Sequence, residues 1–132
     1  MTTHSVLVLK VGGALLQTET GMANLMSAIK DMTATGQKIV LVHGGGCLVD
    51  EQLTANGKEI IKLDGLRVTP ADQIGIVVGA LAGTSNKILQ AAAAKAGVVS
   101  VGMSLGDGNV VNANIKDERL GLVGEVTPND AS

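Results

Sequence analysis

The chain has 132 residues, of which 45% are hydrophobic and 17% are charged, and its formal net charge is −2. This length allows one hydrophobic core, and the composition indicates a folded protein rather than a disordered one. The chain lacks Phe, Tyr and Trp and has no excess of positive charge. It therefore lacks the basic and aromatic surfaces that usually bind nucleic acids.

The single cysteine, Cys47, cannot form a disulfide within the chain, which fits a reducing compartment. The first apolar segment, residues 5–16, is interrupted by Lys10 and two glycines and is too short to cross a bilayer. We therefore expect a cytoplasmic protein with neither a membrane nor a nucleic-acid partner. Cys47 itself is expected to be a small buried residue.

Strand and helix patterns alternate along the first part of the chain. A β-branched run at residues 5–11 ends in two glycines and predicts a buried parallel strand. Apolar residues at helical spacing predict a helix over residues 22–32 that ends at Gly36. Residues 38–42 predict a second buried strand, and a helix is expected over residues 47–55.

A hairpin and a long helix are expected in the middle of the chain. Asp64 and Gly65 are typical of a tight two-residue hairpin turn. Thr69 and Pro70 are typical of a helix start, and they predict one long helix that ends at Gly97.

Three glycines lie four residues apart on this predicted helix, at positions 75, 79 and 83. Each glycine weakens a helix, so the stripe needs a compensating reason. We expect close backbone packing along it, against another helix, the sheet or a second subunit.

The last third of the chain returns to strand patterns. Residues 98–105 predict a third buried strand, and residues 109–127 predict an antiparallel ribbon around a polar turn at residues 117–119. The order of elements predicts an α/β fold, a three-layer α/β/α sandwich with a mostly parallel central sheet plus β-hairpins.

Two of the predicted strands end in glycine clusters, Gly12-Gly13 and Gly44-Gly45-Gly46, and Lys10 precedes the first. Ligands of open α/β sheets bind beyond the carboxyl ends of the strands. Glycines there let backbone N–H groups approach an anion. The two clusters predict an anion-binding cleft, and the alternative is that they only allow tight turns. His43 is interpreted as a hydrogen-bonded strand-end residue rather than a catalytic base.

Several common site motifs are missing from the sequence. Neither glycine cluster has the spacing of a P-loop, and no dinucleotide-binding glycine motif follows a predicted strand. No group of His, Cys, Asp and Glu residues has metal-ligand spacing, so no metal site is expected in this chain.

Five segments resemble, in order, N-terminal motifs of the N-acetylglutamate kinases, a branch of the amino acid kinase family. They are residues 9–13, 40–51, 64–70, 78–87 and 101–108. The resemblance covers essentially the whole chain. Residues 65–70 and the helix after them favour acetylglutamate as the substrate, and carbamate and aspartate kinases are the alternatives within the family.

The resemblance implies transfer of the ATP γ-phosphate, with Mg²⁺, to the side-chain carboxylate of N-acetyl-L-glutamate in arginine biosynthesis. Lys10 matches the lysine that contacts the transferring phosphoryl group. Gly45 and Gly46 match glycines whose amides hold substrate and phosphoryl oxygens, and Arg67 matches the arginine that grips the substrate's α-carboxylate.

Gly12, Gly13 and Gly44 are expected to complete the anion site. The resemblance also implies a homodimer joined through this half of the molecule. It covers only the N-terminal half of such enzymes, so residues 1–132 are expected to be the acetylglutamate-binding and dimerisation domain, without the C-terminal nucleotide-binding domain.

We therefore expect this chain to fold, to bind acetylglutamate weakly and not to transfer phosphate alone. Two other classes stay open. One is a non-catalytic or regulatory module that binds an acylated amino acid. The other is a structural or engineered fragment whose motifs are remnants.

Overall fold

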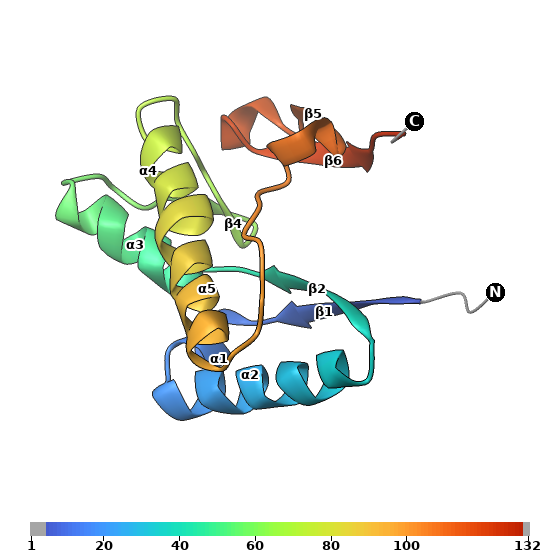
Figure 1. Ribbon diagram of the computed structural model, residues 1–132. Coiled ribbons are helices and arrows are strands. Elements are labelled where there is room, and N and C mark those ends of the chain that lie inside the picture. The colour runs from blue at the N-terminus through green and yellow to red at the C-terminus, as the bar shows by residue number, and fades with distance from the viewer. Residues whose placement is uncertain (1–4, 131–132) are drawn as a thin grey trace. The chain divides into compact units, whose positions relative to one another are not determined.

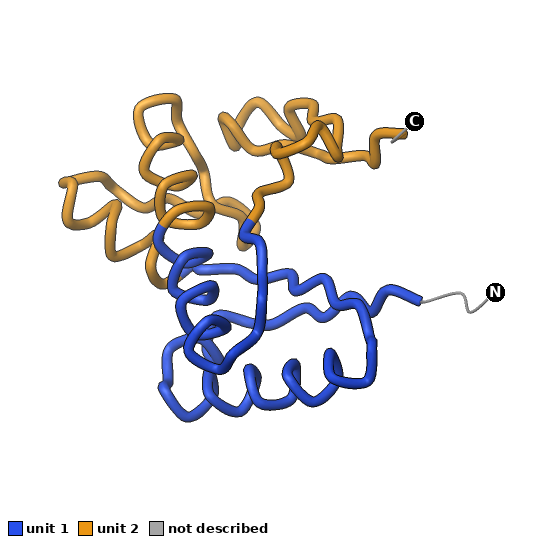
Figure 2. Tube along the Cα trace, in the orientation of Figure 1, with its two compact units in different colours: residues 1–46, 84–102 blue, residues 47–83, 103–132 orange. Residues whose placement is uncertain are grey.

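The computed structural model describes residues 5–130, and Figure 1 shows the order of its elements. The described chain forms two compact units (Figure 2). Unit 1 contains the residues up to Gly46 together with Thr84–Gly102, and unit 2 contains Cys47–Gly83 and the residues from Met103 onwards.

Unit 1 is built on two parallel strands, β1 (Val6–Val11) and β2 (Lys38–His43). Between them in sequence lie a short helix α1 (Gly13–Leu16) and the longer α2 (Glu19–Ala34). Helix α5 (Asn86–Lys95) joins this unit from a later part of the chain (Figure 1). The predicted parallel pair of strands with an intervening helix is confirmed. The predicted burial of both strands is wrong, because Val8 and Val40 are 62% and 49% exposed.

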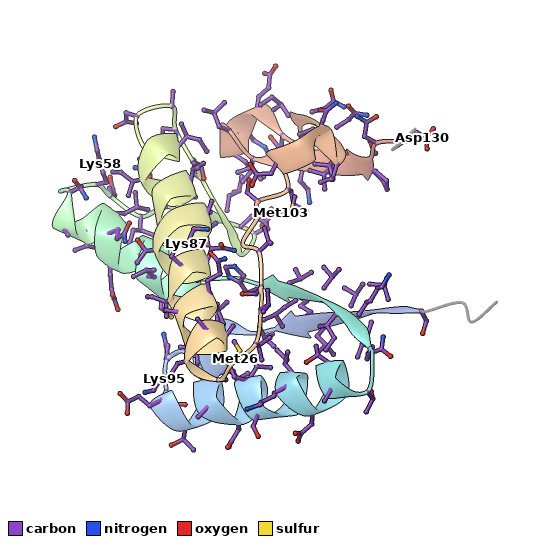
Figure 3. The ribbon with its side chains drawn as sticks, viewed as in Figure 1. Met26, Lys58, Lys87, Lys95, Met103 and Asp130 are labelled. Atoms are coloured by element: carbon purple, nitrogen blue, oxygen red, sulfur yellow. The ribbon has the colours of Figure 1, made fainter. Side chains whose placement is uncertain are left out.

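The core of unit 1 lies between the two long helices and one face of the strand pair. Met26 and Ile29 of α2 pack with Leu89 and Ala93 of α5, and Met26 is labelled there in Figure 3. Half-buried residues of β2, Ile39 among them, pack against this cluster. Along both strands half-buried and exposed residues alternate, as expected for a sheet with one packed face.

Unit 2 contains short helices and two antiparallel hairpins. Its elements are α3 (Gly46–Ala55, whose first residue ends unit 1), β3 (Lys62–Leu63), β4 (Leu66–Arg67), α4 (Ile74–Val78), the 3₁₀ turn η2 (Asp107–Asn109), β5 (Val111–Ile115), the 3₁₀ turn η3 (Glu118–Leu120) and β6 (Gly124–Pro128). A π-helix, η1 (Gly79–Ser85), joins α4 to α5 in sequence. Val49, Leu53 and Ala80 form the buried core of this unit.

Both predicted hairpins are confirmed. β3 pairs with β4 across Asp64 and Gly65, whose φ angles of 49° and 79° suit the tight turn that the sequence predicts. β5 pairs with β6 in antiparallel register. In the turn between them, hydrogen bonds from the Arg119 side chain and backbone lower the pKa of Asp117 below its ordinary value. Together with the parallel pair and its helices, these hairpins confirm the predicted α/β class.

The predicted helix start at Thr69 and Pro70 is wrong, because α4 begins at Ile74. The Thr69 amide donates to the Leu120 carbonyl at 2.8 Å, and the Thr69 carbonyl accepts from Leu122 at 2.8 Å. Thr69 is thus held as an extended residue instead of a helix cap. The two predicted helix ends are confirmed, since Gly36 and Gly97 have φ angles of 86° and 78°.

The predicted third strand, residues 98–105, is also wrong: this segment forms no strand in the described chain. Val99 is 98% exposed and Val101 is 82% exposed. β-branched composition favours a strand only where a neighbouring strand supplies hydrogen bonds and side-chain packing. No strand of the described chain pairs with this segment.

The glycine stripe of the predicted long helix is not packed against the described chain. A Cβ atom added at Gly75, Gly79 or Gly83 would have no described atom within 4 Å, apart from the helix's own nearby backbone. No other helix of unit 2 packs closely on the stripe, and packing against the sheet, which belongs to unit 1, stays a prediction. Packing against a second subunit stays a prediction.

Candidate functional site

The two glycine clusters follow neighbouring strands of unit 1. In the parallel register, Lys10 pairs with Val42 and Val11 pairs with His43. Gly12 and Gly44 come directly after the ends of these strands. The predicted adjacency of the two clusters is therefore confirmed.

Four of the five glycines of these clusters, Gly12, Gly13, Gly44 and Gly46, are not required by the surrounding structure. None has a φ angle in the left-handed region, and Gly12 is extended at φ −78° and ψ 157°. A Cβ atom added at Gly12, Gly13, Gly44 or Gly46 would meet no described atom within 4 Å. The backbone there is left open to close approach from outside the chain.

Lys10 is exposed at the end of β1, on the same face of the strand pair as Val8 and Val42. Within residues 5–130 its ammonium group makes no hydrogen bond or ion pair. The positive charge is therefore available to a ligand beside the glycine clusters. The contact of Lys10 with a phosphoryl group stays a prediction.

Helix α3 starts at Gly46, the last glycine of the second cluster. Its first turn contains no acidic side chain, so no carboxylate offsets the positive end of the helix dipole. The start of α3 therefore offers positive potential at the last glycine of the second cluster.

His43 joins the second cluster to the start of α5. Its Nδ1 lies 3.0 Å from the Gly44 carbonyl oxygen, and its Nε2 lies 3.0 Å from Nδ2 of Asn86. Ser85 donates its hydroxyl to the same Gly44 carbonyl at 3.0 Å. The interpretation of His43 as a hydrogen-bonded strand-end residue is confirmed.

Sequence reasoning gave no role to Ser85 and Asn86. Both are buried, at 7% and 8% exposure. They lie in the family-like segment 78–87, but the resemblance assigned neither of them a role. The available signal was a run of four polar residues, 84–87, inside an otherwise apolar helical pattern. Only the fold brings them to the end of β2.

Arg67 belongs to unit 2, where it lies in β4 at the end of the tight hairpin. Its guanidinium forms an ion pair with the carboxylate of Asp50 from α3. The Arg67 side chain is 17% exposed, so it is not a solvated surface charge. It already recognises a carboxylate of its own chain, the chemistry that the sequence predicts for it toward a ligand.

Cys47 is exposed, and the expectation of a buried residue is wrong. Val49 and Leu53, two and six positions further along α3, face the core of unit 2. At about 100° per residue, Cys47 lies about 160° around the helix from Val49 and about 120° from Leu53. Its place in the first turn therefore leaves it in solvent.

Two features are absent from residues 5–130. No group of three or more His, Cys, Asp or Glu side chains in this part of the chain could hold a metal ion. No described helix is both long enough and apolar enough to span a bilayer.

The sequence profile of the amino acid kinase family matches residues 5–132. The chain belongs to the amino acid kinase family. A curated acetylglutamate kinase from Shewanella denitrificans is 84% identical over 128 residues, which are 97% of this chain and 49% of that protein. The acetylglutamate kinase of Shewanella putrefaciens is 72% identical over 131 residues, 99% of this chain and 50% of the relative.

The chain thus spans about half the length of the curated relatives it matches. The predicted resemblance to the N-terminal half of acetylglutamate kinases is confirmed by these relatives. Among solved structures, the smu.665 protein of Streptococcus mutans superposes with a TM-score of 0.83 at 34% identity, covering 92% of this chain and 49% of that one. N-acetylglutamate synthase from Neisseria gonorrhoeae, complexed with coenzyme A and N-acetyl-glutamate, superposes at 0.71 with 26% identity, covering 95% and 29%.

Proposed function

We propose that this chain is the N-terminal, substrate-binding half of a kinase that transfers the ATP γ-phosphate to the side-chain carboxylate of N-acetyl-L-glutamate. The single observation that carries the proposal is the pair of open glycine clusters at neighbouring strand ends, with Lys10 beside them. The acetylglutamate kinases that match nearly all of this chain support the choice of substrate.

The reaction brings a carboxylate and a phosphate together, and two anions at close range repel strongly in a site that excludes water. Fixed donors that neutralise the charge therefore lower the barrier. In this proposal Lys10 contacts the transferring phosphoryl group, and the amides of Gly45 and Gly46 hold substrate and phosphoryl oxygens. Gly12, Gly13 and Gly44 keep the surrounding backbone open for that approach.

The nucleophile needs no general base, because a carboxylate is already ionised near neutral pH. This agrees with a site in which His43 is committed to hydrogen bonds with Gly44 and Asn86. Arg67 takes the α-carboxylate of the substrate, for which its planar fork is suited.

The phosphoryl donor ATP follows from the kinase family, and most of its binding site is assigned to a C-terminal half. The described residues offer no cluster of carboxylates for Mg²⁺, so no step on this chain is assigned to a metal ion. The same proposal includes the cytoplasm, where ATP is available, and a homodimer joined through the open glycine stripe at Gly75, Gly79 and Gly83.

Calorimetry tests the proposal on the 132-residue chain. N-acetyl-L-glutamate should bind weakly, and ATP should not bind measurably. Hydroxylamine, which traps acyl phosphates, should detect no product when both compounds are present. Acyl phosphate made by this chain alone would overturn its assignment as a half-enzyme. Absence of any acetylglutamate binding would overturn the substrate assignment.

A second candidate is a non-catalytic module that binds an acylated amino acid. The favouring observation is the fold shared with a synthase whose structure holds N-acetyl-glutamate, since a fold of this kind is not restricted to kinases. Fusing the chain to the remaining half of its Shewanella denitrificans relative separates the two. Recovered ATP-dependent acyl phosphate formation supports the kinase, and tight ligand binding without turnover supports the module.

A further inference from the structure

A buried polar cluster lies beside the second glycine cluster, entirely within unit 1. Ser85 and Asn86 are 7% and 8% exposed. Buried hydroxyl and amide groups are costly unless they are hydrogen-bonded. Both side chains direct their hydrogen bonds to the end of β2, at His43 and Gly44.

The hydrogen bonds define the proton position on His43. The Asn86 Nδ2 group is a donor, so Nε2 of His43 accepts and carries no proton. The ring proton of neutral His43 is therefore on Nδ1, which donates to the Gly44 carbonyl at 3.0 Å. Nζ of Lys87, near the amide oxygen of Asn86, supports this orientation of the amide.

The Gly44 carbonyl oxygen thus receives two donors, Nδ1 of His43 and Oγ of Ser85, each at 3.0 Å. The peptide unit is planar and trans, so the Gly44 carbonyl and the Gly45 N–H point in opposite directions. Because the Gly44 carbonyl points toward Ser85, the Gly45 N–H points away from Ser85.

Glycine residues give this loop more backbone freedom than any other residue type would. An amide that binds an anion well must already point at it, because ordering it on binding costs free energy. The cluster removes this freedom at the peptide between Gly44 and Gly45. The π-helix η1 ends at Ser85, and π-helical turns are often found at functional sites.

Residues of the segment after α5, Ser100 and Gly102, also contact the cluster. Lys87 and Gln90 are hydrogen-bonded at 2.8 Å, and Gln90 donates to the Ser100 carbonyl at 3.2 Å. A Cβ atom added at Gly102 would collide with the Asn86 amide oxygen and lie 2.8 Å from Oε1 of Gln90. Gly102 therefore leaves the space that the Asn86 side chain needs.

We propose that Ser85 and Asn86 are positioning residues, which act through His43 and the Gly44 carbonyl to aim the Gly45 N–H into the anion site. The inference rests on the proposed function only in assigning the Gly45 amide to anion binding. The orientation of the peptide itself is a property of the unliganded chain and is tested separately.

The first experiment needs no ligand and no variant. The ¹⁵N chemical shifts of the His43 ring at neutral pH should report a protonated Nδ1 and an unprotonated Nε2. The opposite tautomer would overturn the proposal, because Asn86 could not then donate to Nε2.

The second experiment compares variants in the 132-residue chain. Ser85→Ala should shift the Gly45 amide resonance and weaken binding of N-acetyl-L-glutamate or inorganic phosphate about fivefold, the effect of one lost hydrogen bond. Ser85→Thr, which keeps the hydroxyl, should restore both. Ser100→Ala is the matched control, because the substitution keeps the Ser100 carbonyl that accepts the hydrogen bond from Gln90. Gly102→Ala should disturb the same resonance by displacing Asn86.

A merely structural role would give a different pattern. An unchanged Gly45 resonance in both Ser85→Ala and Gly102→Ala would contradict the proposal, as would an affinity loss that Ser85→Thr does not restore. If the unaltered chain binds neither ligand, the proposed function fails. The tautomer and the Gly45 resonance then still decide the positioning role.

Discussion

Lys10 and Lys38 make a natural comparison at the scale of single residues. Both are exposed, and both lie on the same face of the strand pair, but Lys10 is near the carboxyl end of β1 and Lys38 begins β2. Side chain type and exposure are therefore matched, and only the distance along the strands from the glycine clusters differs.

We predict that Lys10→Met weakens binding of N-acetyl-L-glutamate or phosphate about tenfold to a hundredfold, the range for one charged hydrogen bond. Lys38→Met should leave affinity nearly unchanged, and neither variant should unfold the chain. The measurement is an NMR titration of the two variants. Equal effects of both substitutions would show that general surface charge, not the site, attracts the anion.

Arg67 is predicted to recognise one specific group, the α-carboxylate. Arg67→Lys should therefore weaken N-acetyl-L-glutamate binding about tenfold, because an ammonium group lacks the bidentate fork. The same substitution should leave the binding of 4-acetamidobutanoate unchanged, because this compound lacks the α-carboxylate. Arg119→Lys, an exposed arginine of the same unit, is the control. Equal losses for the two ligands would exclude this role of Arg67.

At the scale of elements, backbone angles and close contacts limit which residues a position tolerates. Gly121 shows this most clearly. Its φ angle is 70° and its ψ angle is −130°. An added Cβ atom would lie 2.5 Å from the Thr69 carbonyl oxygen. That carbonyl accepts the hydrogen bond from Leu122 that holds Thr69 beside the η3 turn.

Gly121→Ala should destabilise the fold by more than Gly57→Ala, as measured by urea unfolding. Gly57 has a similar φ angle of 67° but open space around its Cβ position. The Gly57 variant should lose about 1 kcal/mol from backbone strain alone, and the Gly121 variant about 3 kcal/mol or more from strain and collision. Equal losses would contradict the contact between Thr69 and Gly121.

The glycine stripe is a second test at the scale of elements. Gly79→Ala should leave the monomer equally stable or raise its stability by up to about 1 kcal/mol, because glycine weakens helices and no described atom is near. Gly79→Leu should be tolerated by the monomer but should prevent the proposed homodimer. Analytical ultracentrifugation measures the outcome, and an unchanged oligomeric state in Gly79→Leu would contradict the homodimer proposal at this stripe.

At the scale of the molecule, local sequence patterns predicted most of the helices, strands and turns. The predictions were wrong where residues distant in sequence determine the local structure. The Asp64-Gly65 turn and the glycine helix ends depend on their own backbone angles, so the sequence contains the information. The helix cap predicted at Thr69 is absent, because Leu120 and Leu122, much later in the chain, take the backbone hydrogen bonds of Thr69.

The strand predicted around Val99 is absent for a related reason. Its composition is that of a buried strand, but burial needs a partner that the described chain does not supply. Val8 and Val40 are also exposed, at 62% and 49%, on the outer face of the strand pair. These apolar surfaces belong to the same unit as the glycine clusters.

The residues of the candidate site also differ in whether the sequence alone predicts them. Gly12, Gly13 and the glycines after His43 were predictable, because a strand followed by glycines is a local sequence pattern. The parallel register of β1 and β2 then places the two clusters at neighbouring strand ends. Asn86 was not predictable from the sequence, because its role depends on a histidine 43 positions earlier in the chain.

The central claim is that the two glycine-lined strand ends and Lys10 form a single anion-binding site. The most direct measurement is an NMR titration of the ¹⁵N-labelled chain with N-acetyl-L-glutamate. The amides of Gly12, Gly13 and Gly44–46 should shift together with one saturation curve, while those of the β5–β6 ribbon should not move. Shifts confined to one cluster, or spread evenly over the chain, would contradict the account.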